Sequence, residues 1–186
     1  MRLTCVGSGS SGNSYVLEDR GHRLILDVGM PWKEIQIACG FDVSSIDACI
    51  ATHGHGDHCK YIPKVIPNGI DCYTGVKAVE PIYNSTGCAP KSISERSWTS
   101  IREWSAIAVE VHHDVPCYGY IIVTPGGERL AYFTDYSYIG ANEKEKTLKT
   151  LNINHWLIAV NYTGEPDTDG AKSAHIYSGH SSLEYV

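Results

Sequence analysis

The alternation of apolar and polar positions along the chain predicts many short strands separated by turns. Close to the N-terminus, three strands are expected at Leu3–Val6, Ser14–Leu17 and Leu24–Asp27, with Gly-rich turns between them. A continuous apolar run then predicts a buried strand at Ala48–Thr52. Later strands are expected at Ile70–Tyr73, Ala106–Val111 and Trp156–Val160, with a hairpin of Tyr118–Thr124 and Glu128–Thr134 across a Pro-Gly-Gly turn.

Helices are predicted between several of these strands. The first is expected at 31–39, where it starts at a proline and stops at Gly40. Others are expected at 57–66, where Pro63 requires a break or a late start, at 76–83 with an interruption at Pro81, and at 142–151. Residues 84–104 carry no clear pattern, and 163–173 read as a polar loop. Interspersed strands and helices indicate a layered α/β or α+β fold. Since no repeat or linker divides the chain, we expect a single domain over residues 1–186.

Composition narrows the class of protein. Hydrophobic residues make up 42% and charged residues 19%, which is a normal globular balance. The net charge of −6 argues against non-specific binding of nucleic acid, but two bound divalent cations would still let a phosphate enter a cleft. The 7 cysteines include no CxxC pair, which suits reduced thiols. With no signal peptide and no apolar stretch of about 20 residues, we expect a soluble, cytoplasmic protein that does not bind membranes.

The strongest chemical signal directly follows the buried strand at Ala48–Thr52. It contains His53, His55, Asp57 and His58, separated by Gly54 and Gly56. Imidazole nitrogen and carboxylate oxygen are ligands for zinc and similar divalent ions. The glycines let the backbone approach a metal closely. A polar surface loop is the alternative reading, but three histidines and one aspartate at this spacing are far more specific than a two-residue motif.

At these residues the chain resembles the metallo-β-lactamase superfamily, whose signature is H-x-H-x-D-H at the end of a strand. The stretches Gly7–Ser14, Leu24–Gly29 and His113–Tyr120 are similar to the YycJ/WalJ-like branch and to its phage-encoded relatives that cleave cyclic nucleotides. The resemblance implies a four-layer αββα sandwich with metals at the sheet edge. It also allows a homodimer.

The resemblance further implies a set of ligands for two divalent ions, with zinc expected and manganese as the alternative. His53, His55 and a later histidine would hold the first ion, and this later residue is His113 or its neighbour His112, with His113 favoured. Asp57 and His58 would hold the second ion. Asp135 would bridge both, and Asp27 would orient a ligand imidazole, although each of these aspartates also reads as an ordinary cap or turn residue.

The segment Gly179-His180-Ser181-Ser182 resembles a G-H-[SL]-S segment of the nucleic-acid-processing branches, where the histidine assists the leaving group. A further histidine on a later strand completes the second metal site in the family, and the sequence ends at Val186 without it. Three alternatives follow. The chain lacks the family's C-terminal strand and helix, or His180 serves as the missing ligand, or the second ion is weakly held.

Gly7-x-Gly9-x-x-Gly12 also matches a dinucleotide-binding fingerprint, but a strand is expected next rather than a helix, so no nicotinamide or flavin cofactor is predicted. The function expected is a metal-dependent phosphodiesterase, in which hydroxide held by two metals attacks a cyclic nucleotide or a nucleic-acid end. Asp57 and His180 would be its catalytic residues. The alternatives are a thioester or lactam hydrolase on the same fold, and a truncated, weakly active metal-binding module.

Overall fold

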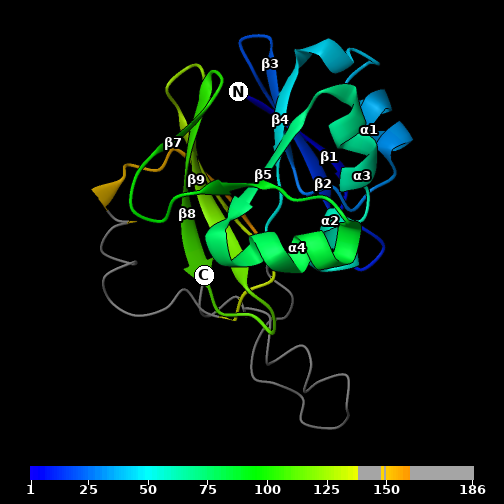
Figure 1. Ribbon diagram of the computed structural model, residues 1–186. Helices are drawn as coiled ribbons and strands as arrows, with labels where there is room; N and C mark the ends of the chain where they lie inside the picture. Colours follow the sequence, from blue (N-terminus) through cyan, green and yellow to red (C-terminus); the bar gives the residue numbers. More distant parts are fainter. Residues whose placement is uncertain (138–147, 149, 160–186) are drawn as a thin grey trace, which may run out of the picture.

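Two β-sheets packed face to face form the centre of the molecule, which the computed structural model describes over residues 1–137, 148 and 150–159 (Figure 1). The first sheet has the order β1 (Arg2–Gly7), β2 (Ser14–Asp19), β3 (His22–Leu26), β4 (Ile46–Ile50), β5 (Asp71–Gly75) and β6 (Lys91–Ile93). Strands β1 to β3 are antiparallel, and β3 to β6 run parallel to one another. Parallel strands end at the same sheet edge, so the loop after β4 leaves the sheet beside the loop after β3.

The second sheet has the order β11 (His155–Ile158), β10 (Arg129–Phe133), β9 (Cys117–Val123), β8 (Trp104–Val111) and β7 (Thr99–Ile101). Strands β7 to β10 pair antiparallel, and β11 joins β10 in parallel. Side chains alternate between its two faces, as the period of a strand requires. Tyr118, Tyr120 and Ile122 face the core shared with the first sheet, whereas Cys117 and Ile121 join a second apolar cluster.

Helices cover the first sheet on the side away from the second sheet (Figure 1). They are α1 (Trp32–Ala38), α2 (Gly56–Cys59), α3 (Ile62–Val65) and α4 (Val79–Thr86), with 3-10 turns at Val43–Ser45, Ile66–Asn68 and Val76–Ala78. This cover explains why all five residues of β4 are buried. On the opposite side of the molecule, the helical residue Leu148 packs in the second apolar cluster. The predicted αββα sandwich is confirmed.

Most of the predicted elements are present, with informative exceptions. The hairpin of β9 and β10 is confirmed. A break in the helix predicted at 57–66 is also confirmed: α2 ends at Cys59 and α3 begins at Ile62, so Pro63 falls in the first turn of α3. The interruption predicted at Pro81 is wrong, because α4 begins at Val79 and the proline falls in its first turn, where a backbone N–H has no helical partner. The short strands β6 and β7 form where no pattern was found. Most of 142–151 and all of 163–173 lie outside the described residues.

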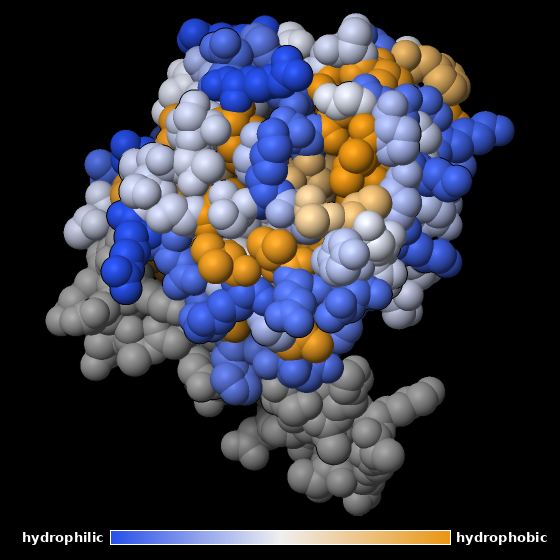
Figure 2. All heavy atoms as spheres, viewed as in Figure 1, coloured by the Kyte–Doolittle hydropathy of each residue, from blue (hydrophilic) through white to orange (hydrophobic). Residues whose placement is uncertain are grey.

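No helix in the part of the chain that the structure describes is long and apolar enough to cross a membrane. On the face seen in Figure 2, apolar side chains are exposed in patches among hydrophilic ones. The large apolar side chains that are exposed come from separate elements, for example Phe41 after α1, Tyr83 on α4 and Trp156 on β11. The homodimer stays a prediction.

Candidate metal centre

The candidate site lies where loops from both sheets meet. His53 and His55 follow β4, and α2 places Asp57 and His58 one turn later. From the second sheet, His113 follows β8 and Asp135 follows β10. All six residues that the sequence singles out in this part of the chain therefore gather at one end of the sandwich, although more than 50 positions separate the first loop from His113.

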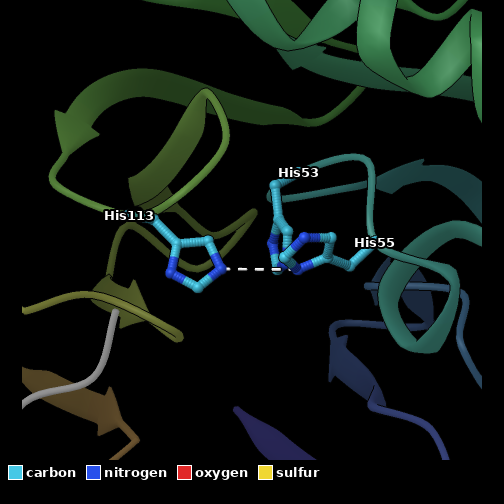
Figure 3. Close-up of side chains that lie close together, drawn as sticks. All are labelled: His53, His55 and His113. Atoms are coloured by element: carbon cyan, nitrogen blue, oxygen red, sulfur yellow. Dashed lines mark hydrogen bonds between the residues drawn. The ribbon is translucent and has the colours of Figure 1, made fainter. Parts of the chain in front are cut away.

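Three histidines form the first ligand group, which consists of His53, His55 and His113. One ring nitrogen from each lies within 4.8 Å of the other two. His53 Nε2 is 3.0 Å from His55 Nδ1, and His113 Nε2 is 3.4 Å from the same atom (Figure 3). Figure 3 shows His113 approaching from the opposite side of the group to the loop that carries His53 and His55. The three rings meet edge to face, so their nitrogens converge rather than stack.

The second ligand group consists of His53, His58 and Asp135, and it again satisfies the 4.8 Å spacing. Asp135 Oδ2 lies 2.6 Å from His58 Nε2 and 3.9 Å from His53 Nε2. Asp57 Oδ2 lies 3.6 Å from His58 Nε2. His53 is thus common to the two groups, and Asp135 contacts both His53 and His58, as a ligand predicted to bridge two ions would.

A buried hydrogen-bond network fixes His58. Asp27 is fully buried, and its Oδ2 lies 2.8 Å from His58 Nδ1. The same oxygen accepts a hydrogen bond from the Tyr132 hydroxyl at 2.5 Å, and Oδ1 accepts the Thr52 backbone N–H at 2.7 Å. On the other side of the ring, Asn13 Nδ2 lies 3.0 Å from His58 Nε2. A carboxylate behind a ligand imidazole sets its tautomer and raises its basicity, which is the role expected of Asp27.

Electrostatics distinguish the two buried imidazoles. Burial and the neighbouring His58 lower the pKa of His53 well below its ordinary value, which leaves it in the neutral form that binds metals. Burial also disfavours a charge on His58, but the carboxylates of Asp27 and Asp135 outweigh burial and raise the pKa of His58 to about 10. The metal centre therefore favours a positive charge next to the carboxylates of Asp27 and Asp135. Converging imidazoles and a central carboxylate fit borderline divalent ions such as zinc.

The other histidines are placed elsewhere, as far as the structure describes them. His112 is exposed, and its Nδ1 lies 2.8 Å from Ser137 Oγ, so the structure brings His113 and not His112 to the group. His22 pairs with Asp47, and His155 lies near Glu128. His180 lies outside the described residues, and its predicted role stays a prediction.

Several contacts were not predicted from the sequence. Asn13, Tyr132 and Asp114 were not assigned roles, yet Asn13 and Tyr132 reach the His58 network and Asp114 lies beside His113. Asn13 and Asp114 lie in the segments Gly7–Ser14 and His113–Tyr120, which resemble the family. This resemblance was the one signal in the sequence that could have pointed to them. Tyr132 offered none, because its hydroxyl reaches Asp27 only when the two sheets pack. The Gly-rich loop leads into strand β2, so the strand predicted after it is confirmed.

The centre opens into a cleft of about 580 Å³. Asp57, Asp135, His55 and His113 line its polar side, and Ser8 and Ser10 from the first loop lie on its rim. Tyr15, Phe133 and Leu157 contribute apolar surface. This volume lies within the range of small-molecule sites, and the combination of convergent polar groups with apolar walls is typical of them.

Comparisons with known proteins agree with this geometry. Residues 7–70 match the model of the metallo-beta-lactamase superfamily, and this segment carries four of the six residues. The chain is 31% identical over 88 residues to the exodeoxyribonuclease WalJ of Streptococcus pneumoniae, which covers 45% of this chain and 33% of that protein. It is 38% identical over 65 residues to the anti-Pycsar protein Apyc1 of Bacillus phage 010DV004, covering 31% and 25% respectively.

These matches span about a third of the length of WalJ and a quarter of that of Apyc1. The comparison with solved structures covers much more of the chain than the sequence matches do. The metallo-beta-lactamase fold protein YhfI from Bacillus subtilis superposes with a TM-score of 0.69 at 16% identity, over 98% of this chain and 78% of that one. The N-terminal part of the chain, with its histidine loop, is therefore similar in sequence to the metallo-β-lactamase superfamily, and the sandwich that presents this loop has the metallo-β-lactamase fold.

Proposed function

We propose that the protein is a metal-dependent phosphodiesterase that cleaves a nucleotide phosphodiester, either a cyclic nucleotide or a nucleic-acid end. One observation carries the proposal. On the wall of an open cleft, the Asp135 carboxylate lies 3.9 Å from Nε2 of His53, a predicted ligand of the first ion, and 2.6 Å from Nε2 of His58, a predicted ligand of the second ion. A shared hard oxygen ligand suits a pair of ions that together face a phosphoryl group.

In this proposal His53, His55 and His113 hold one ion, Asp57 and His58 hold the other, and Asp135 contacts both. When bound, two divalent ions would lower the pKa of water toward neutrality and neutralise charge on the phosphoryl oxygens. Asp57 also lines the cleft, so its carboxylate would be available to accept a hydrogen bond from the attacking water. Asp27, Tyr132 and Thr52 hold His58 in place, so the site needs little rearrangement before reaction.

The charge of the cleft makes the reaction depend on cations. Asp57, Asp135 and the nearby Asp114 carry acidic side chains at the entrance, and the chain as a whole has a net charge of −6. Without cations these carboxylates repel a phosphodiester. Cations held by these residues would reverse the local charge, and the cleft would then attract a phosphodiester.

Two features favour a small nucleotide over a long nucleic acid. The acidic balance of the chain gives no counterion-release contribution to binding a long polyanion. The cleft of about 580 Å³ suits a ligand of mononucleotide size. The similarity to an exodeoxyribonuclease and to a phage anti-Pycsar protein supports phosphodiester chemistry and keeps a DNA end among the substrates to be tested.

A turnover screen tests the proposal. Purified protein with added manganese or zinc is incubated with cyclic mononucleotides, short single-stranded DNA and RNA, bis-p-nitrophenyl phosphate, nitrocefin and a glutathione thioester. We expect phosphodiester cleavage that disappears with EDTA and in an Asp135→Asn variant. Turnover of nitrocefin or the thioester alone would overturn the proposal in favour of a different hydrolase. Absence of turnover on every substrate, with both ions bound, would favour a metal-binding module.

A further inference from the structure

Asp114 has no part in the ligand set described above, yet its carboxylate joins two of the three imidazoles of the first group. Its Oδ1 lies 3.0 Å from His113 Nε2, and its Oδ2 lies 3.6 Å from His55 Nε2. The groups of ligand atoms that converge within 4.8 Å in the described part of the chain do not include it. Asp114 therefore lies beside the triangle of ligand nitrogens and outside it.

The orientation of the His55 ring indicates a role for the Asp114 carboxylate. His55 turns Nδ1 toward His53 Nε2 and His113 Nε2, so Nδ1 is its metal-facing atom. A neutral imidazole that binds metal through Nδ1 carries its proton on Nε2, and that N–H requires an acceptor. Asp114 Oδ2 is the carboxylate oxygen recorded near this atom.

We propose that Asp114 is a positioning residue of the first ion: its Oδ2, at an ion-pair distance of 3.6 Å from His55 Nε2, attracts the Nε2–H and so favours the His55 tautomer that presents Nδ1 to the metal. The inference rests on the metal centre of the proposed function and extends it to a residue that the H-x-H-x-D-H motif does not contain. His58 has a buried carboxylate of this kind in Asp27. Asp114 supplies the equivalent for the more exposed His55. It follows the second sheet, three residues after Val111, the last residue of β8.

The location of Asp114 makes the proposal testable without damage to the fold. Its side chain is 40% exposed, so an isosteric Asp114→Asn change removes the negative charge and the strong acceptor without opening a cavity. Glu110→Gln is the matched control. Glu110 stands on β8, the strand that precedes Asp114, and its carboxylate pairs with Lys77, so this change removes one negative charge from a different ion pair.

The experiment is calorimetric titration of metal-free protein with zinc and with manganese, repeated on Asp114→Asn, Asp114→Glu and Glu110→Gln. Asp114→Asn is expected to lower the affinity for one of the two ions by about 10–100-fold and to leave the affinity for the other within about 2-fold. A loss of this size is typical when a residue that hydrogen-bonds to a metal ligand is mutated. Asp114→Glu should restore part of the loss, and Glu110→Gln should bind as the wild type does. Cobalt substitution adds a spectroscopic readout, because the absorption bands of the weakened site should shift.

Three results would overturn the inference: unchanged affinity for both ions in Asp114→Asn, equal weakening in Glu110→Gln, or a melting temperature of the metal-free variant that falls below that of the wild type while both ions weaken together. These readouts do not require turnover. Failure to hydrolyse any phosphodiester, with normal metal binding, would contradict the proposed function and leave this inference standing.

Discussion

At the scale of single residues, two aspartates are held in backbone conformations that most residues avoid. Asp27 has φ of +56° and Asp135 has φ of +45°, each just after a strand end. Left-handed backbone costs free energy for a residue with a Cβ, and aspartate tolerates it better than most. Such conformations persist where surrounding contacts determine them, and here both turns aim a carboxylate at His58.

His113 and His112 provide a matched pair of substitutions. His113→Ala removes a nitrogen of the first ligand group, so we expect one of two bound ions to be lost and phosphodiester turnover to fall by about 100-fold or more. His112→Ala removes an exposed ring that contacts Ser137, so metal content and turnover should stay close to wild type. Elemental analysis after gel filtration measures the ions. Equal losses in the two variants would contradict the assignment.

Asp135→Asn tests the shared ligand. Asparagine accepts the same left-handed backbone but carries no charge, so its amide holds two cations poorly. We expect bound metal and turnover to fall together, by about 10-fold or more in affinity. Ser137→Ala, in the same loop, is the control. Retention of two tightly bound ions in Asp135→Asn would exclude a shared role.

The sequence predicts residue roles well where the chemistry is local. The cluster from His53 to His58 is visible because its residues are adjacent, and Asp27 and Asp135 could be proposed because each ends an apolar run. Asn13, Tyr132 and Asp114 could not be assigned, because their contacts, with His58, Asp27 and His55 respectively, depend on how separate loops and sheets pack.

At the scale of elements, three loops are joined by backbone hydrogen bonds beneath the site. Asn13 donates its N–H to the Asp57 carbonyl at 2.7 Å, Val28 donates to the His58 carbonyl at 2.7 Å, and Gly29 donates to the Asn13 carbonyl at 2.9 Å. The Gly-rich loop, the turn after β3 and the histidine loop therefore form one unit. This arrangement explains why the resemblance to the metallo-β-lactamase superfamily includes the segments Gly7–Ser14 and Leu24–Gly29 as well as the histidine loop.

Gly29 is the tightest point of that unit. A Cβ at this position would overlap the Asp57 carbonyl, so Gly29→Ala must push the histidine loop away. We expect a loss of stability of about 1–3 kcal/mol by analogy with overpacked cores, together with weaker metal binding. Gly56→Ala is the control in the same loop, because a Cβ there meets no atom within 4 Å. Thermal melting and metal titration measure both effects, and a Gly29→Ala protein that behaves like Gly56→Ala would refute this packing account.

Element boundaries were harder to predict than element types. Strands β6 and β7 have 3 residues each, too few for a periodic pattern, and they form because neighbouring strands offer backbone partners. The helix α4 continues through Pro81 because the proline lies in its first turn. In both places the tertiary context decides what the local pattern leaves open.

At the scale of the whole molecule, the metal centre joins the two sheets. His53, His55, Asp57 and His58 come from the first sheet, whereas His113 and Asp135 come from the second. Ions held across this boundary bind the folded chain and not the unfolded one, so they stabilise the fold by mass action. The layered fold itself was predictable, because its hairpin, its buried strands and its motif loop all carry clear patterns.

Removal of metal should therefore lower the melting temperature. An ion present at 100 times its dissociation constant contributes about 2.7 kcal/mol, which corresponds to about 5–10 °C for a chain of this length. Differential scanning calorimetry with saturating zinc and with EDTA measures the difference. The double variant His55→Ala/Asp135→Asn should melt at the same temperature in both buffers. Equal melting temperatures for the wild type would show that no ion bridges the sheets.

The most direct test of the account is an anomalous diffraction map of the zinc-loaded protein. We expect two peaks at the end of the sandwich, one about 2.0–2.2 Å from ligand atoms of His53, His55 and His113, and one at the same distance from Asp57 and His58, with Asp135 reaching both. A single peak, or peaks held by residues outside these six, would contradict the central claim.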